Sequence, residues 1–544
     1  MKTLLIFAGF ILLHISANIV FAGNVIISPD DSVKYMNWYN MHPKTDKVMG
    51  VGANLTYSEL LKDRTSVTVV VAVIDSGVDI EHEDLKDVIW TNEDEIPDNG
   101  KDDDYNGFID DIHGWNFIGN SDGENINHEN TELTRIIRKY SERFGDREES
   151  DIPDDEKEEY KKYLEYIKTF DKELKDEKDK LENLQKFENG FTGAESIVLP
   201  FLKDSNYTIA DLKGISSTSY RVNLAKDYLI TILDAGWSKK GFYEYKKHVE
   251  SKVKYVYNPD FDARKIIGDN PDEFDHDYGN NDVKGVRYDH GTHVAGIIGA
   301  KRDNGIGIDG IAGNVRLMIL RVVPDGDEYD KDVANAIIYS VDNGAQIINM
   351  SFGKDYSPQK FMVDSAIRYA ESKGVLLIHA SGNEATDNDV VEHYPTKKKE
   401  DGVIVSNWIT VGASSIKSNK YLPGIFSNYG DTAVDLFAPG VNIISCKPGN
   451  KYEMQSGTSM ACPVTTGVAA ALWSYFPELS VSELIDVMMK SVYRPGKMKV
   501  LIPDTESPKR AKVRFSDLCV SEGIISLYNA VQLILQMESN TTDE

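Results

Sequence analysis

The chain has 544 residues, of which 41% are hydrophobic, and its 60 basic and 88 acidic residues give a formal net charge of −28. This composition is typical of a globular protein, and the length predicts about three domains. The acidic excess argues against nucleic acid or an anionic membrane surface as the main partner, because a phosphate backbone is bound by a basic face.

The N-terminus has the pattern of an export signal. Lys2 precedes an apolar run over 4–20, and Ala22 completes a small-residue cleavage site. We interpret residues 1–22 as a signal peptide, which predicts a secreted or exported protein, periplasmic or extracellular. The alternative is an uncleaved membrane anchor, against which polar residues within the run argue. No later stretch reaches the about 18 continuous apolar residues of a spanning helix, so we expect no membrane span after cleavage.

Residues 23–65 form a polar lead-in, which ends at the first predicted strand. Positions 67–74 are apolar at nearly every site and are followed by Asp75. Such a run is typical of a strand that is buried on both faces, as in a parallel sheet. Ligand chemistry gathers at the carboxyl ends of such strands, and Asp75 lies at one of them.

An acidic loop follows, with oxygen ligands at alternate positions. Asp102, Asp104, Asn106 and Asp110, with a glycine at the sixth position, are similar to the first half of an EF-hand loop. His113 stands at the twelfth position, where a complete EF-hand has glutamate. We predict a structural Ca²⁺ site here. The alternative is a turn whose Asp and Asn side chains satisfy only its own backbone.

Residues 130–262 are rich in Lys and Glu and mostly helical in pattern. Tyr160, Ile167, Leu174 and Leu181 lie seven apart and form one apolar seam. Charged residues four positions after members of this seam argue against a long coiled coil, so we predict an amphipathic helix packed on neighbouring helices. We interpret the segment as an inserted helical subdomain. It is either a solvated spacer or a lid or partner-docking arm over the active cleft.

Strand patterns then alternate with helical ones to the end of the chain. Strands are expected at 316–323, 345–350, 374–380 and 402–412, and helices at 291–301, 330–343, 360–373 and 458–475. This alternation predicts an α/β domain with a doubly wound, mostly parallel sheet flanked by helices. The domain would have two parts, 66–129 and 263–538, followed by a tail at 539–544.

Three residues have the pattern of a serine nucleophile with its base. Asp75 follows a buried strand, while His290 and Ser459 each begin a helix rich in small residues. Acyl transfer by serine needs a base for the hydroxyl proton and a carboxylate to orient that base. Taken alone, Ser459 is equally well explained as a helix cap. We interpret His293, three positions after His290, as a packed helix residue rather than a partner in a metal pair.

Five motifs in this order resemble those of the subtilisin-type serine endopeptidases, the subtilase family. They are VIDSGVD at 73–79, HGTHVAG at 290–296, NMSFG at 349–353, ASGNE at 380–384 and GTSMACP at 457–463. The resemblance covers about 66–115 and 263–535. It implies a subtilisin-like fold, and it implies that Asp75, His290 and Ser459 are the acid, base and nucleophile.

The resemblance also assigns roles in substrate binding. Asn383 would be the side-chain amide of the oxyanion hole, and Ser351, Phe352 and Gly353 would line the pocket for the residue before the scissile bond. Structural calcium is frequent in the family, which supports the prediction for the acidic loop.

Two features depart from the family pattern. Cys462 stands where serine or threonine is usual, and Val464 stands where histidine is common. We expect altered packing rather than lost catalysis, and we hypothesise that the Cys462 thiol makes the protein sensitive to thiol reagents. The other cysteines are Cys446 and Cys519, so one disulfide is possible and the sequence does not assign it. The lead-in is short for a folding propeptide.

We therefore expect an exported, calcium-supported serine endopeptidase that acts on protein or peptide substrates as a monomer. One alternative is a processing protease dedicated to a single partner protein. Another is a non-catalytic binding protein that uses the subtilase scaffold and the helical insertion to hold a partner. The intact Asp75, His290, Ser459 and Asn383 argue against the last, because a scaffold needs none of them.

Overall fold

The computed structural model describes residues 36–145, 147–507 and 509–542. The predicted signal peptide, 1–22, and the first part of the lead-in, 23–35, lie outside the described residues. The described chain divides into two compact units. We call 133–261 the helical unit, and 36–132 together with 262–542 the α/β unit.

The α/β unit is built on one seven-stranded sheet in which every neighbouring pair is parallel. In spatial order the strands are β2 (Gly114–Asn116), β3 (Val315–Arg321), β1 (Val69–Asp75), β4 (Ile347–Met350), β5 (Leu376–Ala380), β6 (Trp408–Ser414) and β7 (Leu436–Pro439). The predicted doubly wound, parallel α/β fold is confirmed. The strand expected at 402–412 begins at Trp408 instead, because Lys398 pairs with Ile404 in a local bridge before it.

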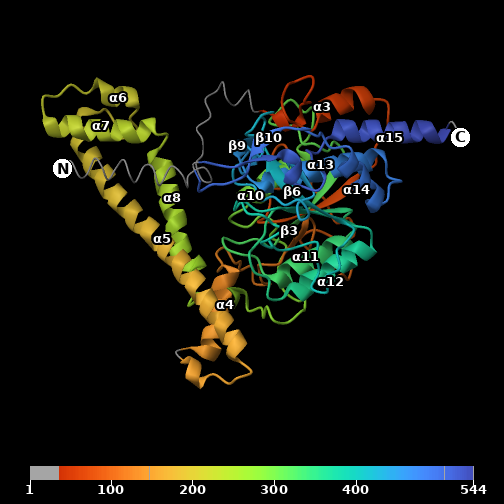
Figure 1. Cartoon of the computed structure of the whole chain (residues 1–544), viewed down its shortest axis with the longest axis horizontal. Helices are drawn as coiled ribbons and strands as arrows, with labels where there is room; N and C mark the ends of the chain where they lie inside the picture. The colour runs from red at the N-terminus through yellow and green to blue at the C-terminus, as the bar shows by residue number, and fades with distance from the viewer. Residues whose placement is uncertain (1–35, 146, 508, 543–544) are drawn as a thin grey trace. The chain divides into compact units, whose positions relative to one another are not determined.

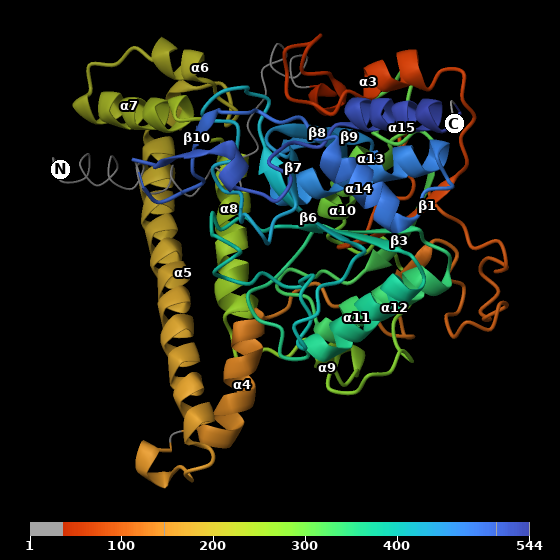
Figure 2. The same ribbon diagram turned by 45° about the vertical axis from the view of Figure 1, so that its right-hand side comes forward.

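Helices cover both faces of this sheet, as Figure 2 shows. They are α10 (Asp289–Gly299), α11 (Asp330–Asp342), α12 (Lys360–Ser372), α13 (Thr458–Tyr475), α14 (Val481–Lys490) and α15 (Leu527–Thr542). α10 and α13 pack on one face, and α11 and α12 lie on the other. The strands of the sheet are buried on both faces, which explains why their sequences are almost continuously apolar.

Two short antiparallel hairpins complete the α/β unit. They are β8 (Ile443–Lys447) with β9 (Lys451–Gln455), and β10 (Lys499–Leu501) with β11 (Lys512–Arg514). The described part of the lead-in also belongs to this unit, since the side chains of Trp38 and Tyr39 are fully buried in it.

The helical unit, whose helices are drawn in orange to yellow-green in Figure 1, has an apolar core of its own. Its helices are α4 (Glu132–Phe144), α5 (Lys157–Val198), α6 (Ile209–Gly214), α7 (Tyr220–Asp234) and α8 (Lys239–Ser251). α5 packs against both α7 and α8, as the prediction of an amphipathic helix required. The most deeply buried apolar side chains of this core are Leu184, Val198, Leu212, Leu229, Ile232 and Val249.

Each residue of the predicted seam is followed three positions later by a member of the buried row of α5. The members of this row are Tyr163, Phe170, Glu177, Leu184 and Phe191. Of the predicted seam only Tyr160 is buried, and Ile167, Leu174 and Leu181 are partly exposed. Positions three and four apart share one helix face, so the seam marked the correct side of the helix but not its centre.

Across the described residues, no helix is long and apolar enough to cross a membrane.

Candidate active site

A buried carboxylate and an imidazole meet at the carboxyl edge of the sheet. Asp75 ends β1 and is 1% exposed, and its Oδ1 lies 2.8 Å from Nδ1 of His290 at the start of α10. The backbone N–H of Ser76 donates to the same carboxylate oxygen at 2.7 Å. The carboxylate is therefore fixed by its own strand end while it orients the ring.

The charge of Asp75 controls the protonation of His290. Burial lowers the pKa of the imidazole, but the negative charge of Asp75 and the hydrogen bond to it outweigh burial. The pKa of His290 is therefore raised above its ordinary value of 6.5. A group held in this way is suited to accept a proton and to be stabilised once it is charged.

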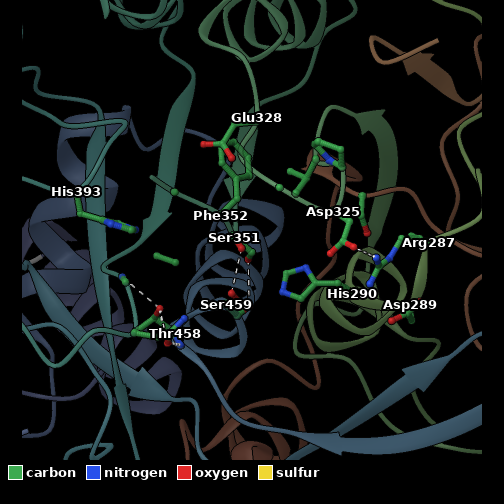
Figure 3. A pocket seen from close by; sticks show the side chains of 18 of the residues that line it. Arg287, Asp289, His290, Asp325, Glu328, Ser351, Phe352, His393, Thr458 and Ser459 are labelled. Atoms are coloured by element: carbon green, nitrogen blue, oxygen red, sulfur yellow. Dashed lines mark hydrogen bonds and ion pairs between the residues drawn. The ribbon is translucent and has the colours of Figure 1, made fainter. Parts of the chain in front are cut away.

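Ser459, the second residue of α13, forms reciprocal hydrogen bonds with Ser351. The Ser459 hydroxyl donates to the Ser351 carbonyl oxygen, and the Ser351 hydroxyl donates to the Ser459 carbonyl oxygen, each at 3.0 Å. Pro463, four residues on in the helix, has no N–H for that carbonyl, and the Ser351 hydroxyl takes its place. Among the described residues, no hydrogen bond joins the Ser459 hydroxyl to His290; Figure 3 shows the two side chains in one cleft.

Asn383 follows β5 and is held by the first residue of α13. Its Oδ1 accepts hydrogen bonds from the backbone N–H of Thr458 at 2.9 Å and from the Thr458 hydroxyl at 3.1 Å. Because the amide oxygen is engaged, the amide N–H groups remain for the cleft that Asn383 lines. The preceding Gly382 has a φ of 104°, which favours glycine at this sharp turn.

These residues line one cavity of about 320 Å³. Its walls include His290, Asn383 and Ser459 together with the predicted substrate wall, Ser351, Phe352 and Gly353. Asp75 lies behind His290. The fold thus brings together all the residues to which the sequence assigned catalysis or substrate binding, from segments up to 384 positions apart in the chain (459 − 75).

Sequence reasoning missed Thr458, which orients Asn383, and His393, which lines the cavity. Thr458 stands within a recognised motif, so its position was available, but its contact with Asn383 depends on the fold. His393 lies outside every motif. His293 is fully buried in α10, and burial lowers its pKa to about 3, so the prediction of a packed helix residue is confirmed.

The thiol of Cys462 is enclosed beneath the cleft. Its Sγ donates to the Asn349 side-chain oxygen and to the Ile378 carbonyl oxygen, both at 3.3 Å. Burial raises the pKa of this thiol to about 12. A buried, protonated thiol is a poor nucleophile, which weighs against the hypothesis of thiol-reagent sensitivity. Cys446 and Cys519 are also buried, and all three cysteines are free.

In the acidic loop, all four predicted ligands accept hydrogen bonds from backbone N–H groups. Asp104 accepts from the N–H of Asn106 at 3.0 Å, and the Asn106 side-chain oxygen accepts from the N–H of Phe108 at 2.8 Å. Asp102 accepts hydrogen bonds from the N–H groups of Asn106 and Gly107, at 3.1 and 2.9 Å. Asp110 accepts from the N–H groups of Asn99 and Gly100, at 3.1 and 2.8 Å. These contacts agree with the alternative interpretation, a turn whose Asp and Asn side chains accept hydrogen bonds from its own backbone N–H groups.

One of these carboxylates, Asp104, also belongs to a different group of acids. Ligand atoms of Glu95, Asp104 and Asp111 all lie within 4.8 Å of one another. The Asn106 amide N–H donates to Asp104 at 3.0 Å and to Asp111 at 3.1 Å. Glu95 is 5% exposed, and its Oε2 has no hydrogen-bond partner among the described residues.

Comparison with known proteins identifies relatives of this chain. A family model described as the subtilase family matches residues 66–515. A thermophilic serine proteinase of Bacillus sp. (strain AK1) is 38% identical over 227 residues, which are 42% of this chain and 51% of that protein. The major intracellular serine protease of Bacillus subtilis (strain 168) is 34% identical over 242 residues, which are 43% of this chain and 71% of that protein.

The chain thus spans about half the length of the first of these relatives. Among solved structures, a cold adapted subtilisin-like serine proteinase is 29% identical, with a TM-score of 0.32. That alignment covers 41% of this chain and 73% of the other.

Proposed function

The chain belongs to the subtilase family, and on that premise we propose that it is a serine-type endopeptidase that hydrolyses peptide bonds through an acyl-enzyme. In this proposal Asp75, His290 and Ser459 are the acid, base and nucleophile. The observation that carries it is the 2.8 Å contact between His290 and the buried carboxylate of Asp75, beside a cleft that holds Ser459.

The proposed reaction begins when neutral His290 takes the hydroxyl proton of Ser459. The serine oxygen forms a bond to the substrate carbonyl carbon, and the carbonyl oxygen becomes an oxyanion. The Asn383 amide N–H and the backbone N–H of Ser459 would stabilise that oxyanion, and Asp75 would stabilise the imidazolium. His290 then gives its proton to the leaving amine as the peptide bond breaks. A water molecule, deprotonated by His290, then attacks the acyl-enzyme carbonyl carbon. The acid product leaves, and Ser459 regains its proton from His290.

Labelling with a fluorophosphonate probe tests this proposal, because the probe reacts only with an activated serine. We expect one adduct, on Ser459, and hydrolysis of unstructured protein substrates. The Ser459→Ala variant is the matched control and should lose both signals while keeping the thermal transition of the parent. An adduct that persists in Ser459→Ala, or a correctly folded parent that takes no label, would contradict the proposal and favour a binding protein.

We further propose that Glu95, Asp104 and Asp111 hold a structural Ca²⁺. Carboxylate oxygens are the ligands that Ca²⁺ prefers, and the buried, unpartnered Oε2 of Glu95 is an atom that such an ion would satisfy. The Asn106 amide N–H groups contact two of these carboxylates, and its side-chain oxygen accepts from the backbone N–H of Phe108 at 2.8 Å, so the proposed ligand set is the three carboxylates. The bound ion would neutralise three clustered acids and stabilise the loop between β1 and β2.

Calorimetry with and without a calcium chelator tests the calcium proposal. We expect the chelator to lower the melting temperature of the parent, with full recovery when Ca²⁺ is restored. Glu95→Gln should lose most of this response, whereas Asp98→Asn, an exposed acid of the same loop, should keep it. Equal responses from the parent and Glu95→Gln would refute the ligand set.

Export is also part of the proposed function, and it rests on the pattern of residues 1–22. Expression in a secreting host followed by N-terminal sequencing is the direct test. The mature protein should begin at Gly23, and retention of Met1 would refute processing.

A further inference from the structure

A second cavity, of about 720 Å³, adjoins the catalytic cleft. Glu384 and His393 line both cavities, so the two share a wall. Figure 3 shows His393 and His290 on opposite sides of Ser459. The second cavity therefore adjoins the part of the cleft that is away from the proposed base.

The lining of this cavity is acidic. Four of its residues are carboxylates, and no lysine or arginine is among the described residues that line it. The acids are Asp355, Glu384, Asp389 and Glu392. A concave surface with one sign of charge concentrates ligands of the opposite sign.

Two of these acids already accept hydrogen bonds from neighbouring residues. Asp389 accepts hydrogen bonds from the backbone N–H groups of 431–433 and from the Thr432 hydroxyl. Glu392 accepts a hydrogen bond from the Tyr394 hydroxyl at 2.7 Å. These two carboxylates help to hold the walls of the cavity.

Asp355 and Glu384 remain to face a ligand. The carboxylate of Asp355 has no hydrogen bond or ion pair with any described residue, and its side chain is exposed to the cavity. Partial burial raises the pKa of Asp355, and the negative charge of Glu384 raises it further. Glu384 uses its Oε2 for the backbone N–H of Asn383 and for Asn428, both at 2.8 Å, and has a second oxygen left. Two carboxylates thus lie near each other. His393, which opposes the rise in the pKa of Asp355, is the one basic side chain among the described residues that line the cavity.

The proposed chemistry fixes which part of a substrate reaches this cavity. The leaving amine must lie on the His290 side, because His290 protonates it. The acyl part, which ends at the residue before the scissile bond, then lies on the other side, toward Asn383 and His393. A long side chain of that residue would extend toward Asp355 and Glu384.

Building on the proposed function, we propose that the second cavity takes the lysine or arginine side chain of the residue before the scissile bond, with Asp355 and Glu384 as the specificity-determining residues. The aliphatic stem of such a side chain would pass the wall formed by Phe352, and its charged end would balance the two carboxylates. The substrate class is therefore peptides and proteins that are cleaved after a basic residue.

Fluorogenic peptides that differ only in the residue before the scissile bond test this inference. We expect kcat/KM to be at least about tenfold higher for arginine and lysine than for leucine, and lowest for glutamate. Asp355→Asn should reduce the ratio of arginine to leucine by about fivefold or more, and high salt should reduce it in the parent. Asp122→Asn removes one charge from an exposed position outside both cavities and should leave the ratio unchanged.

The inference is overturned if the parent prefers leucine, or if Asp355→Asn and Glu384→Gln both keep the ratio of the parent. The ratio is the deciding quantity for Glu384→Gln, because Glu384 also contacts the backbone of Asn383 and its loss would slow every substrate.

Binding without catalysis separates this inference from the proposed function. Product-like peptides that end in arginine or in leucine can be titrated into the Ser459→Ala variant by calorimetry. Tighter binding of the arginine peptide supports an acidic pocket for a basic side chain even if the parent hydrolyses nothing, a result that would contradict only the proposed function. Equal binding of the two peptides overturns the pocket even if the parent is an active protease.

Discussion

The two units of the chain bury their side chains in different ways. In the α/β unit the strands are buried on both faces, and charged groups also lie inside: the Lys331 side chain is 0% exposed and pairs with Asp269, which is 4% exposed. In the helical unit each helix buries one stripe and leaves the rest in water. The Lys175–Asp179 pair on α5 is one of its surface ion pairs, with exposures of 72% and 54%, although the helix also buries Glu177 and Glu195.

This difference concerns how much precision each unit needs around its charged groups. Buried charges are expensive unless they are paired, so the α/β unit needs a precise arrangement around each of them. The same precision holds Asp75 against His290. Exposed ion pairs such as those of α5 contribute little, so the helical unit depends on its apolar stripe.

Removing the buried acid at the edge of the sheet is expected to have the largest effect. Asp75→Asn should lower kcat/KM by about 10⁴-fold, because His290 loses the charge that orients it and stabilises its protonated form. In the parent, activity should fall as the pH drops through the raised pKa of His290, above 6.5. The residual activity of the variant should fall only at lower pH.

A pH–rate profile for both proteins provides this measurement, and the thermal transition of the variant checks that it folds. Asp79→Asn is a matched control, a largely buried acid four positions on that pairs with Lys284 instead. If Asp79→Asn lost as much activity as Asp75→Asn, the special role of Asp75 would be disproved.

A substitution that creates a cavity in the core of the helical unit should lower the stability of this unit and leave peptide hydrolysis unchanged. Leu229 of α7 is fully buried, so Leu229→Ala should destabilise this unit by about 2–5 kcal/mol. We expect calorimetry to resolve an earlier transition, with kcat/KM for short peptides unchanged. Asp227→Ala, at an exposed position of the same helix, should alter neither quantity. A parallel loss of peptide hydrolysis in Leu229→Ala would show that the two units are not energetically separate.

The smallest expected effect is on the pH dependence of unfolding. Burial lowers the pKa of His379 in β5 to about 3, whereas the unfolded chain should titrate near 6.5. Between these values the unfolded state binds the extra proton, so the free energy of unfolding decreases as the pH falls. The slope is up to about 1.4 kcal/mol per pH unit for this histidine.

His379→Gln tests that slope, because a glutamine N–H can still donate to the Phe352 carbonyl oxygen that the ring nitrogen contacts at 2.8 Å. The variant should have a shallower dependence between pH 6.5 and 3 in denaturant titrations. An unchanged slope would assign the acid sensitivity of the α/β unit to its carboxylates.

Local patterns predicted much of the α/β unit. The apolar run before Asp75 and the small residues after His290 and Ser459 indicate buried strands and a tightly packed helix start without knowledge of the fold. β2 was not predicted, because its three residues, Gly114–Asn116, are too few to show a periodic pattern of apolar side chains.

Contacts between distant segments were not predictable in this way. Glu95 joins Asp104 only because the loop folds back, whereas the spacing rule grouped Asp104 with Asp102, Asn106 and Asp110. Likewise, His393 reaches the cleft from a segment without any motif. On α5, the buried row depends on where α7 and α8 pack, and the sequence of α5 alone does not specify this.

The reciprocal hydrogen bonds between Ser459 and Ser351 have a consequence for the speed of the proposed reaction. The hydroxyl that His290 must deprotonate is occupied by the Ser351 carbonyl oxygen at rest, so the side chain must first rotate about one bond. A neutral hydrogen bond contributes about 1 kcal/mol, which is roughly a fivefold difference in population. Only about one molecule in six would then be primed at any instant, and the rotation is fast compared with turnover. The Ser351 carbonyl oxygen would thereby slow the proposed reaction by roughly sixfold.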